Sequence, residues 1–131
     1  MNTDTRLIGT WRLLSLDNTD VLAGPEAAAG GKSSADGLIM YGADGYMSAQ
    51  IISPEGAAPF RPSAYHAYFG TYTVDSTAAT IVHHRIANNN PDAPKDVVRQ
   101  FRFLSDDVLI LFPEGHSAVQ LTFQRAGQAP P

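Results

Sequence analysis

The chain has 131 residues, of which 44% are hydrophobic and 17% charged, so it can bury the core of one domain. Its formal net charge of −4 argues against nucleic acid or an anionic membrane surface as a partner. Because the sequence has no cysteine, disulfides, thiolate metal sites and cysteine nucleophiles are excluded. It shows neither a signal-peptide pattern nor an apolar run of the ~18 residues that cross a bilayer. We expect a cytoplasmic protein with a single domain over residues 1–131.

Eight short runs rich in β-branched and aromatic residues predict eight antiparallel strands. In chain order they cover residues 10–17, 37–41, 46–52, 69–75, 80–87, 97–104, 108–112 and 118–125. Short turn sequences separate most of the runs, as is typical of antiparallel meanders. The sequence therefore predicts an all-β fold, and eight such strands can close into a barrel that holds packed side chains or one small ligand.

The one helical signal is at residues 63–68, where Ser63 can cap one or two turns. Residues 53–62 are rich in Gly, Pro and Ala and predict a loop. We expect residues 53–68 to lie across the open mouth of the barrel and to gate access, although a plain strand connection is the alternative. The ligand contacts expected from this segment are Phe60, Tyr65 or Tyr68.

Alternation along two predicted strands places an arginine among inward apolar residues. Arg99 shares a face with Val97 and Phe101, and Arg125 shares a face with Phe123. A buried guanidinium is costly unless it is paired or stacked. For Arg125 a structural role at a barrel end is favoured, whereas for Arg99 a structural role and a ligand-binding role are both open.

Two adjacent histidines lie in one predicted strand, so their side chains point to opposite faces. Alternation alone leans towards His84 as the inward residue, because Val82 and Ile86 share its face. The inward histidine is either a hydrogen-bonded core residue or a proton-transferring group at a cavity wall. We expect it to face one solvent-reachable cavity together with Arg99. Burial and Arg99 would keep the histidine neutral, and a ligand oxyanion or carboxylate would supply the missing counter-charge of the arginine.

Several motifs resemble those of a known superfamily. LIGTWRLLS at residues 7–15 is similar to the opening Gly-x-Trp motif of the lipocalin/calycin superfamily, and LTFQR at residues 121–125 is similar to its last-strand arginine. DGYMSA at residues 44–49 and YFGTYTVD at residues 68–75 resemble a family of small stand-alone bacterial and fungal lipocalin-like domains. The resemblance covers residues 7–125, the expected core of the domain.

The resemblance implies a closed or nearly closed antiparallel barrel with an internal pocket. It implies that the indole of Trp11 packs under the guanidinium of Arg125 at the closed end, where cation–π attraction favours the stack. It favours His83 rather than His84 as the inward histidine. Arg85 shares the face of His83, where the family usually has an apolar residue, and would lie near the cavity or at its rim.

Three functions are weighed. The first is a cofactor-free isomerase, cyclase or lyase of natural-product type, with His83 as general acid or base and Arg99 stabilising an enolate or phenolate. The second is a carrier or sensor with the same cavity, and the third is a filled barrel whose surface binds a protein. For the first two, the ligand is a small, largely apolar, oxygen-bearing molecule of aromatic or polyketide-like kind.

The residues expected to contact this ligand are Tyr46, Ser48, Tyr65, Tyr68, Tyr72, His84, Arg85 and Phe101. We expect no metal, since His83 and His84 diverge and no metal-binding motif is present. No cofactor motif is present either, and the chain is expected to act as a monomer or homodimer.

Overall fold

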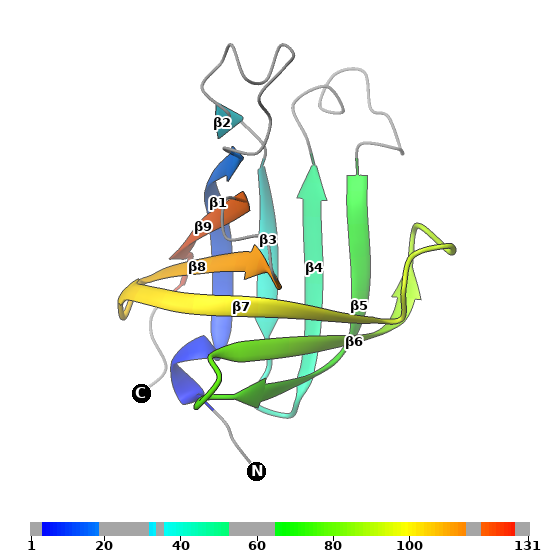
Figure 1. Ribbon diagram of the computed structural model, residues 1–131, viewed down its shortest axis with the longest axis horizontal. Helices are drawn as coiled ribbons and strands as arrows, with labels where there is room; N and C mark the ends of the chain where they lie inside the picture. The colour runs from blue at the N-terminus through cyan, green and yellow to red at the C-terminus, as the bar shows by residue number, and fades with distance from the viewer. Residues whose placement is uncertain (1–3, 19–31, 34–35, 53–64, 115–118, 128–131) are drawn as a thin grey trace.

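The computed structural model describes residues 4–18, 32–33, 36–52, 65–114 and 119–127. Within these ranges the chain forms one short 3₁₀ helix and nine strands (Figure 1). They are η1 (Thr5–Leu7), β1 (Gly9–Asn18), β2 (Lys32–Ser33), β3 (Asp36–Tyr41), β4 (Tyr46–Ile52), β5 (Tyr65–Asp75), β6 (Thr80–Asn88), β7 (Asp96–Ser105), β8 (Val108–Pro113) and β9 (Val119–Arg125).

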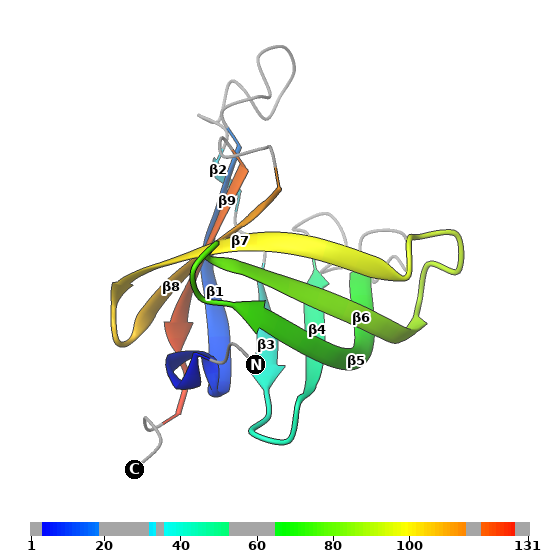
Figure 2. The same ribbon diagram turned by 60° about the horizontal axis from the view of Figure 1, so that its bottom comes forward.

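Eight of the strands close into an antiparallel barrel. The order is β1-β3-β4-β5-β6-β7-β8-β9, and β9 pairs back onto β1 along most of its length. The two-residue strand β2 lies outside this circuit and pairs only with the end of β1. Figure 2 shows β5, β6 and β7 crossing in front of β1, β3 and β4, so that the two groups of strands enclose the interior. The predicted eight-stranded all-β barrel is confirmed.

The prediction of a helix at residues 63–68 is wrong for residues 65–68, the part of it that the structure describes. Residues 65–68 form the beginning of β5 and pair with the end of β4 in regular register. A single helical turn gains little on its own, whereas the strand satisfies its backbone groups and buries alternate side chains. The rest of the expected gate, residues 53–64 with Phe60, lies outside the described residues.

Three bulges interrupt the alternation of inner and outer residues. Leu14 in β1, Ile86 in β6 and Leu104 in β7 are extra residues with no partner opposite them. Each of these side chains is more than half exposed. Because a bulge shifts the alternation by one residue, the inner face resumes at Leu16 in β1 and at Asn88 in β6. The bulges in β1 and β6 therefore decide which residues of these two strands face the interior beyond Leu14 and Ile86.

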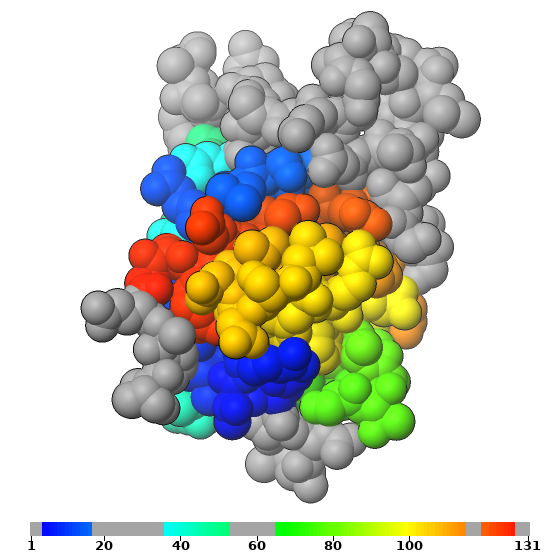
Figure 3. All heavy atoms as spheres, turned by 90° about the vertical axis from the view of Figure 1, so that its left-hand side faces the viewer, coloured from blue at the N-terminus to red at the C-terminus, as the bar shows by residue number. Residues whose placement is uncertain are grey.

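Trp11 and Arg125 fill the closed end of the barrel. They are cross-strand partners between β1 and β9, and the guanidinium carbon lies 4.3 Å from the centroid of the buried indole. The indole Nε1 donates a hydrogen bond to the carbonyl of Leu7 at 2.9 Å. The guanidinium donates to three backbone carbonyls, those of Arg6, Ile8 and Asp106. Figure 3 shows η1 lying beneath the β7–β8 hairpin on this face. The predicted stacking of Trp11 on Arg125 is confirmed.

Replacing Trp11 by alanine should lower the free energy of unfolding by about 3–5 kcal/mol, as expected for loss of a fully buried aromatic side chain. Urea unfolding followed by circular dichroism measures the change. Leu14→Ala is the control, because this bulge residue is 55% exposed and should change stability by less than about 0.5 kcal/mol. If Trp11→Ala lowered the free energy of unfolding by less than about 1 kcal/mol, Trp11 would not be the residue that stabilises the closed end of the barrel.

Gly70→Ala should destabilise the barrel by about 1–3 kcal/mol, the usual cost of forcing extra atoms into a packed site. A Cβ at Gly70 would overlap the backbone carbonyl oxygen of His84, where β5 runs close to the bulge of β6. The matched control is Gly127→Ala, since a Cβ at Gly127 meets no atom within 4 Å. Equal melting temperatures for the two variants would show that Gly70 in β5 does not pack against the backbone of β6 at His84.

Candidate functional site

A cavity of about 290 Å³ opens inside the barrel, towards the end where β4 stops and β5 starts. Eight of the fifteen residues that line it are apolar and seven have polar side chains. The lining residues are Leu16, Ile39, Ala49, Ile51, His66, Tyr68, His83, Arg85, Asn88, Asn90, Ala93, Arg99, Leu111, Pro113 and Leu121. A concave, largely apolar space with a few convergent polar groups is the usual form of a small-molecule site.

Arg99 lies on the inner face of β7 and lines this cavity, as alternation predicts. Its only hydrogen bond within the described residues runs from Nη1 to the carbonyl of Val98 at a long 3.4 Å. No described carboxylate lies within ion-pair distance of it, unlike Arg12, which is paired with Asp36. Burial, with Arg85 nearby, lowers the pKa of Arg99 from its ordinary value, but a guanidinium remains charged. The cavity wall therefore carries a partly buried positive charge that has no carboxylate partner among the described residues.

His83 is the inward histidine, with 1% of its surface exposed. Its Nε2 lies 2.7 Å from the hydroxyl of Tyr41, and its Nδ1 lies 2.8 Å from the hydroxyl of Tyr68. Burial, with Arg99 and Arg85 nearby, lowers the pKa of His83 to about 3. The burial of His83 and the direction of this pKa shift agree with the expectation that burial and Arg99 keep the histidine neutral.

The two tyrosines that bond His83 differ in their access to the cavity. Tyr41 is 2% exposed at the end of β3 and does not line the cavity, and burial raises its pKa well above the ordinary value. Tyr68 on β5 lines the cavity, and burial raises its pKa as well, although Arg99 and Arg85 oppose the shift. Both are therefore neutral hydroxyls at neutral pH, and they form the chain Tyr41–His83–Tyr68, which ends at the cavity.

Arg85 lines the cavity, which agrees with the expectation that it lies near the cavity or at its rim. Its guanidinium carbon lies 5.0 Å from the ring centroid of Tyr68, and its Nε donates to the carbonyl of Pro94 at 2.9 Å. The Arg85 charge is thus anchored to the β6–β7 connection and the Tyr68 ring. Arg99 has no comparable anchor among the described residues.

Four residues expected to contact a ligand lie on the outer face of the barrel instead. They are Tyr46, Ser48, Tyr65 and His84. In β4 the buried positions are Met47 and Ala49, so the residues that alternate with them point away from the cavity. On β6 the imidazole of His84 bonds the side chains of Thr73 and Asp96 across the outer surface.

Two further expected contacts point inward but do not line the cavity. The hydroxyl of Tyr72 donates to the carbonyl of Gly42 at 2.7 Å, near the closed end. Phe101 is buried in the core and packs edge-on against Phe103, with ring centroids 5.9 Å apart. Neither lines the 290 Å³ cavity, so the structure brings together Arg99, His83, Tyr68 and Arg85 from the predicted set.

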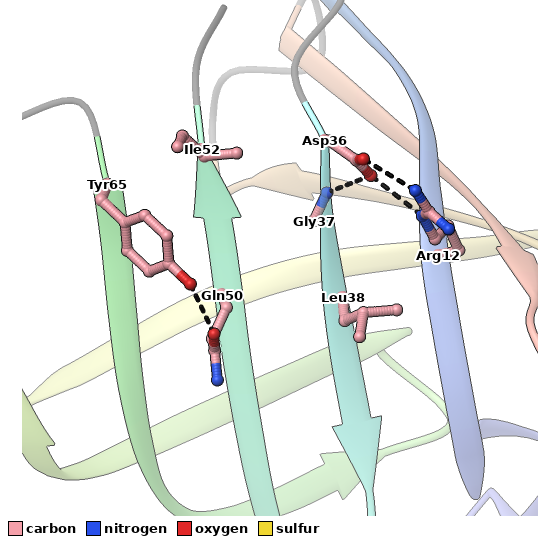
Figure 4. Close-up of a pocket in the computed structure, with 7 residues that line it drawn as sticks. All are labelled: Arg12, Asp36, Gly37, Leu38, Gln50, Ile52 and Tyr65. Atoms are coloured by element: carbon pink, nitrogen blue, oxygen red, sulfur yellow. Dashed lines mark hydrogen bonds and ion pairs between the residues drawn. The ribbon is translucent and has the colours of Figure 1, made fainter. Parts of the chain in front are cut away.

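A second hollow of about 240 Å³ lies on the outer face of β1, β3, β4 and β5 (Figure 4). Arg12 and Asp36 form a two-point ion pair there, with nitrogen–oxygen distances of 3.0 and 2.7 Å. The hydroxyl of Tyr65 donates to Gln50 at 2.5 Å. These polar groups bond one another, whereas Arg99 in the barrel has no such side-chain partner in the part of the chain that the structure describes, so the inner cavity is the better candidate.

Sequence reasoning missed Tyr41, His66 and Asn88. Tyr41 bonds His83 from β3, although the two residues are 42 positions apart. Alternation with the apolar Ile39 is a signal that places Tyr41 inward, but nothing in the sequence pairs it with His83. His66 and Asn88 line the mouth. His66 falls within the helix predicted at residues 63–68, and the bulge at Ile86 shifts the alternation so that Asn88 turns inward.

No described trio of histidine, cysteine, aspartate or glutamate side chains is placed to hold a metal ion. In the part of the chain that the structure describes, no helix has the length and apolarity needed to cross a membrane. No protein-family model matches the chain, and neither does any curated protein.

The low pKa of His83 predicts a specific loss of stability in mild acid. The unfolded chain takes up this proton near pH 6.5, while the folded chain resists it down to about pH 3. Between these values the unfolded state binds more protons, so the free energy of unfolding falls as the pH is lowered. Each pH unit below 6.5 lowers the free energy of unfolding by about 1.4 kcal/mol, which amounts to roughly 3 kcal/mol by pH 4.

Urea unfolding at a series of pH values measures this slope. His83→Gln can still bond both tyrosine hydroxyls but has no proton to take up, so its stability should change less between pH 6.5 and pH 4. The control is Leu14→Ala on the outer face, which removes no titratable group and should keep the wild-type slope. A wild-type slope in His83→Gln would show that another group causes the acid sensitivity.

Proposed function

We propose that this protein binds a small, largely apolar molecule inside the barrel through an anionic oxygen group held by Arg99. The observation that carries the proposal is the partly buried guanidinium of Arg99, which faces the cavity without a carboxylate partner among the described residues. A charge removed from water is costly unless an opposite charge or strong hydrogen bonds compensate it. A ligand carboxylate, enolate or phenolate would supply both.

The size and lining of the cavity support a ligand of one or two rings. A volume of about 290 Å³ equals about ten water molecules at ~30 Å³ each, which corresponds to roughly ten to fifteen non-hydrogen atoms. Leucine, isoleucine and alanine side chains form much of the wall and would contact the apolar part of the ligand. The polar side chains are confined to one wall and the mouth, which favours a molecule with one polar end.

Catalysis is the second candidate function, and the chain Tyr41–His83–Tyr68 favours it. Arg99 and Tyr68 would stabilise an oxyanion that develops on the substrate, which suits a cofactor-free isomerase or cyclase of natural-product type. His83 would then orient the Tyr68 hydroxyl rather than exchange protons with the substrate, because both of its ring nitrogens are occupied by tyrosine hydroxyls. Deuterium exchange next to the carbonyl of phenylpyruvate, followed by NMR, tests this. Acceleration by the wild type and not by Arg99→Met supports an enzyme, and its absence leaves a carrier or sensor.

We also propose that the barrel belongs among the lipocalin-like domains. The support is the eight-stranded antiparallel closure together with the stacked Trp11 and Arg125, the pair that the resemblance implies. The internal cavity is consistent with the small-molecule binding that this relation implies.

Arg99→Met should weaken the binding of an aryl carboxylate such as phenylacetate by at least about 30-fold, because losing a desolvated charge pair costs ~2 kcal/mol or more. Calorimetry measures the affinity. The free energy of unfolding should stay equal or rise, since methionine fills a similar volume without a buried charge.

The matched control is Arg102→Met on the same strand, because the side chain of Arg102 is exposed on the outer face of β7. This variant should bind phenylacetate like the wild type. Unchanged affinity in Arg99→Met, or an equal loss in both variants, would refute Arg99 as the anchor.

A further inference from the structure

We infer that His83 is a positioning residue that holds the hydroxyl proton of Tyr68 towards the cavity, so that Tyr68 and Arg99 both present hydrogen-bond donors to the ligand. This inference rests on the proposed function for the ligand it names. The protonation pattern itself belongs to the free protein and can be measured without a ligand.

The argument begins at Tyr41, whose hydroxyl is fully enclosed by the barrel core. Its one hydrogen-bond partner in the described residues is Nε2 of His83, at 2.7 Å. A buried hydroxyl hydrogen needs an acceptor, and a neutral imidazole has one donor nitrogen and one acceptor nitrogen. If Nε2 carried the hydrogen, the hydroxyl hydrogen of Tyr41 would have no acceptor among the described residues. Tyr41 therefore donates to Nε2.

The same choice fixes the other side of the ring. With Nε2 as the acceptor, the ring hydrogen is on Nδ1, which donates to the hydroxyl oxygen of Tyr68 at 2.8 Å. The hydroxyl hydrogen of Tyr68 then cannot point at His83, and it is directed at the cavity that this residue lines. One buried tyrosine, through one histidine, thus sets the direction of a hydrogen bond in the cavity.

The chain is a fixed arrangement rather than a route for protons. If Tyr68 gave its proton away and recovered one through His83, the last donor would be Tyr41, which would be left as a buried tyrosinate. Burial raises the pKa of Tyr41 well above its ordinary value, so this state is strongly disfavoured. His83 therefore orients Tyr68 and does not replenish its proton.

Two donors in one apolar cavity select the polar group of the ligand. Arg99 carries only donors, and Tyr68, as oriented by His83, presents its hydrogen. A carboxylate, enolate or phenolate oxygen accepts from both. A primary amide of the same shape has no charge to offer Arg99; its carbonyl oxygen can accept from these donors, but its NH2 group takes the place of the second acceptor oxygen. We therefore expect the cavity to prefer an aryl carboxylate over its amide.

The first experiment measures the His83 ring directly. Long-range ¹H–¹⁵N correlation spectra of the ¹⁵N-histidine-labelled protein at neutral pH distinguish the protonated ring nitrogen from the bare one. We expect a hydrogen on Nδ1 and none on Nε2. A hydrogen on Nε2, or on both nitrogens, would overturn the inference whatever the ligand.

The second experiment uses Tyr41→Phe, which removes the hydroxyl that selects the tautomer without touching the cavity. If His83 then populates both tautomers equally, the affinity for phenylacetate falls by about twofold, and by more if the other tautomer dominates. Tyr68→Phe, which deletes the donor itself, should lose about 10- to 100-fold. The affinity for phenylacetamide should fall less than that for phenylacetate in both variants, because a hydrogen bond to a neutral carbonyl is weaker than one to a carboxylate.

The control is Tyr72→Phe, the loss of a neighbouring inward hydroxyl that bonds the Gly42 carbonyl and not His83. It should keep the wild-type tautomer and the wild-type affinity for phenylacetate. Equal weakening of phenylacetate and phenylacetamide in Tyr41→Phe would indicate general damage and would overturn the inference. Phenylacetate that fails to bind even the wild type would instead count against the proposed function, while the tautomer spectrum would still decide the role of His83.

Discussion

The barrel depends on the seal at one end, where the guanidinium of Arg125 lies on the indole of Trp11. The contact joins the first and last long strands, and this pairing closes the sheet on itself. Three backbone carbonyls accept hydrogen bonds from this inward arginine, and the Asp107 carboxylate lies 3.4 Å from its Nε, so the seal itself compensates the charge. Because one end is filled in this way, the space that remains lies towards the other end.

The two inward arginines show how the same residue type takes two roles in one fold. Arg125 is stacked and donates to three carbonyls, whereas Arg99 makes a single long hydrogen bond in the described structure. The difference is one of position, since Arg99 projects into the cavity from the middle of β7. A partly buried guanidinium with no carboxylate partner among the described residues favours the binding of an anion. The buried His83, with its two tyrosines, completes the polar wall opposite the apolar one.

Regular alternation allowed the barrel and its inward arginines to be predicted, because β7 and β9 run without interruption through Arg99 and Arg125. In β6 regular alternation predicts the wrong inward histidine, because Ile86 shares the face of His84 and makes that face the more apolar one in the sequence. Ile86 is the bulge residue and is 59% exposed, so it says nothing about the inner face. Tyr46 and Ser48 in β4 carry the hydroxyls expected of ligand contacts, but they alternate with the buried Met47 and Ala49 and therefore lie on the outer face. The bond between Tyr41 and His83 joins strands that are not neighbours in the sheet, and it depends on barrel curvature that no local pattern encodes.

A crystal structure of the protein with phenylacetate tests the central claim most directly, because it shows which groups hold the ligand oxygen. The account predicts the carboxylate within hydrogen-bond distance of Arg99 and the Tyr68 hydroxyl, with the ring against the apolar wall. A carboxylate bound at Arg85 or in the outer hollow at Arg12, with Arg99 turned back onto backbone carbonyls, would contradict it.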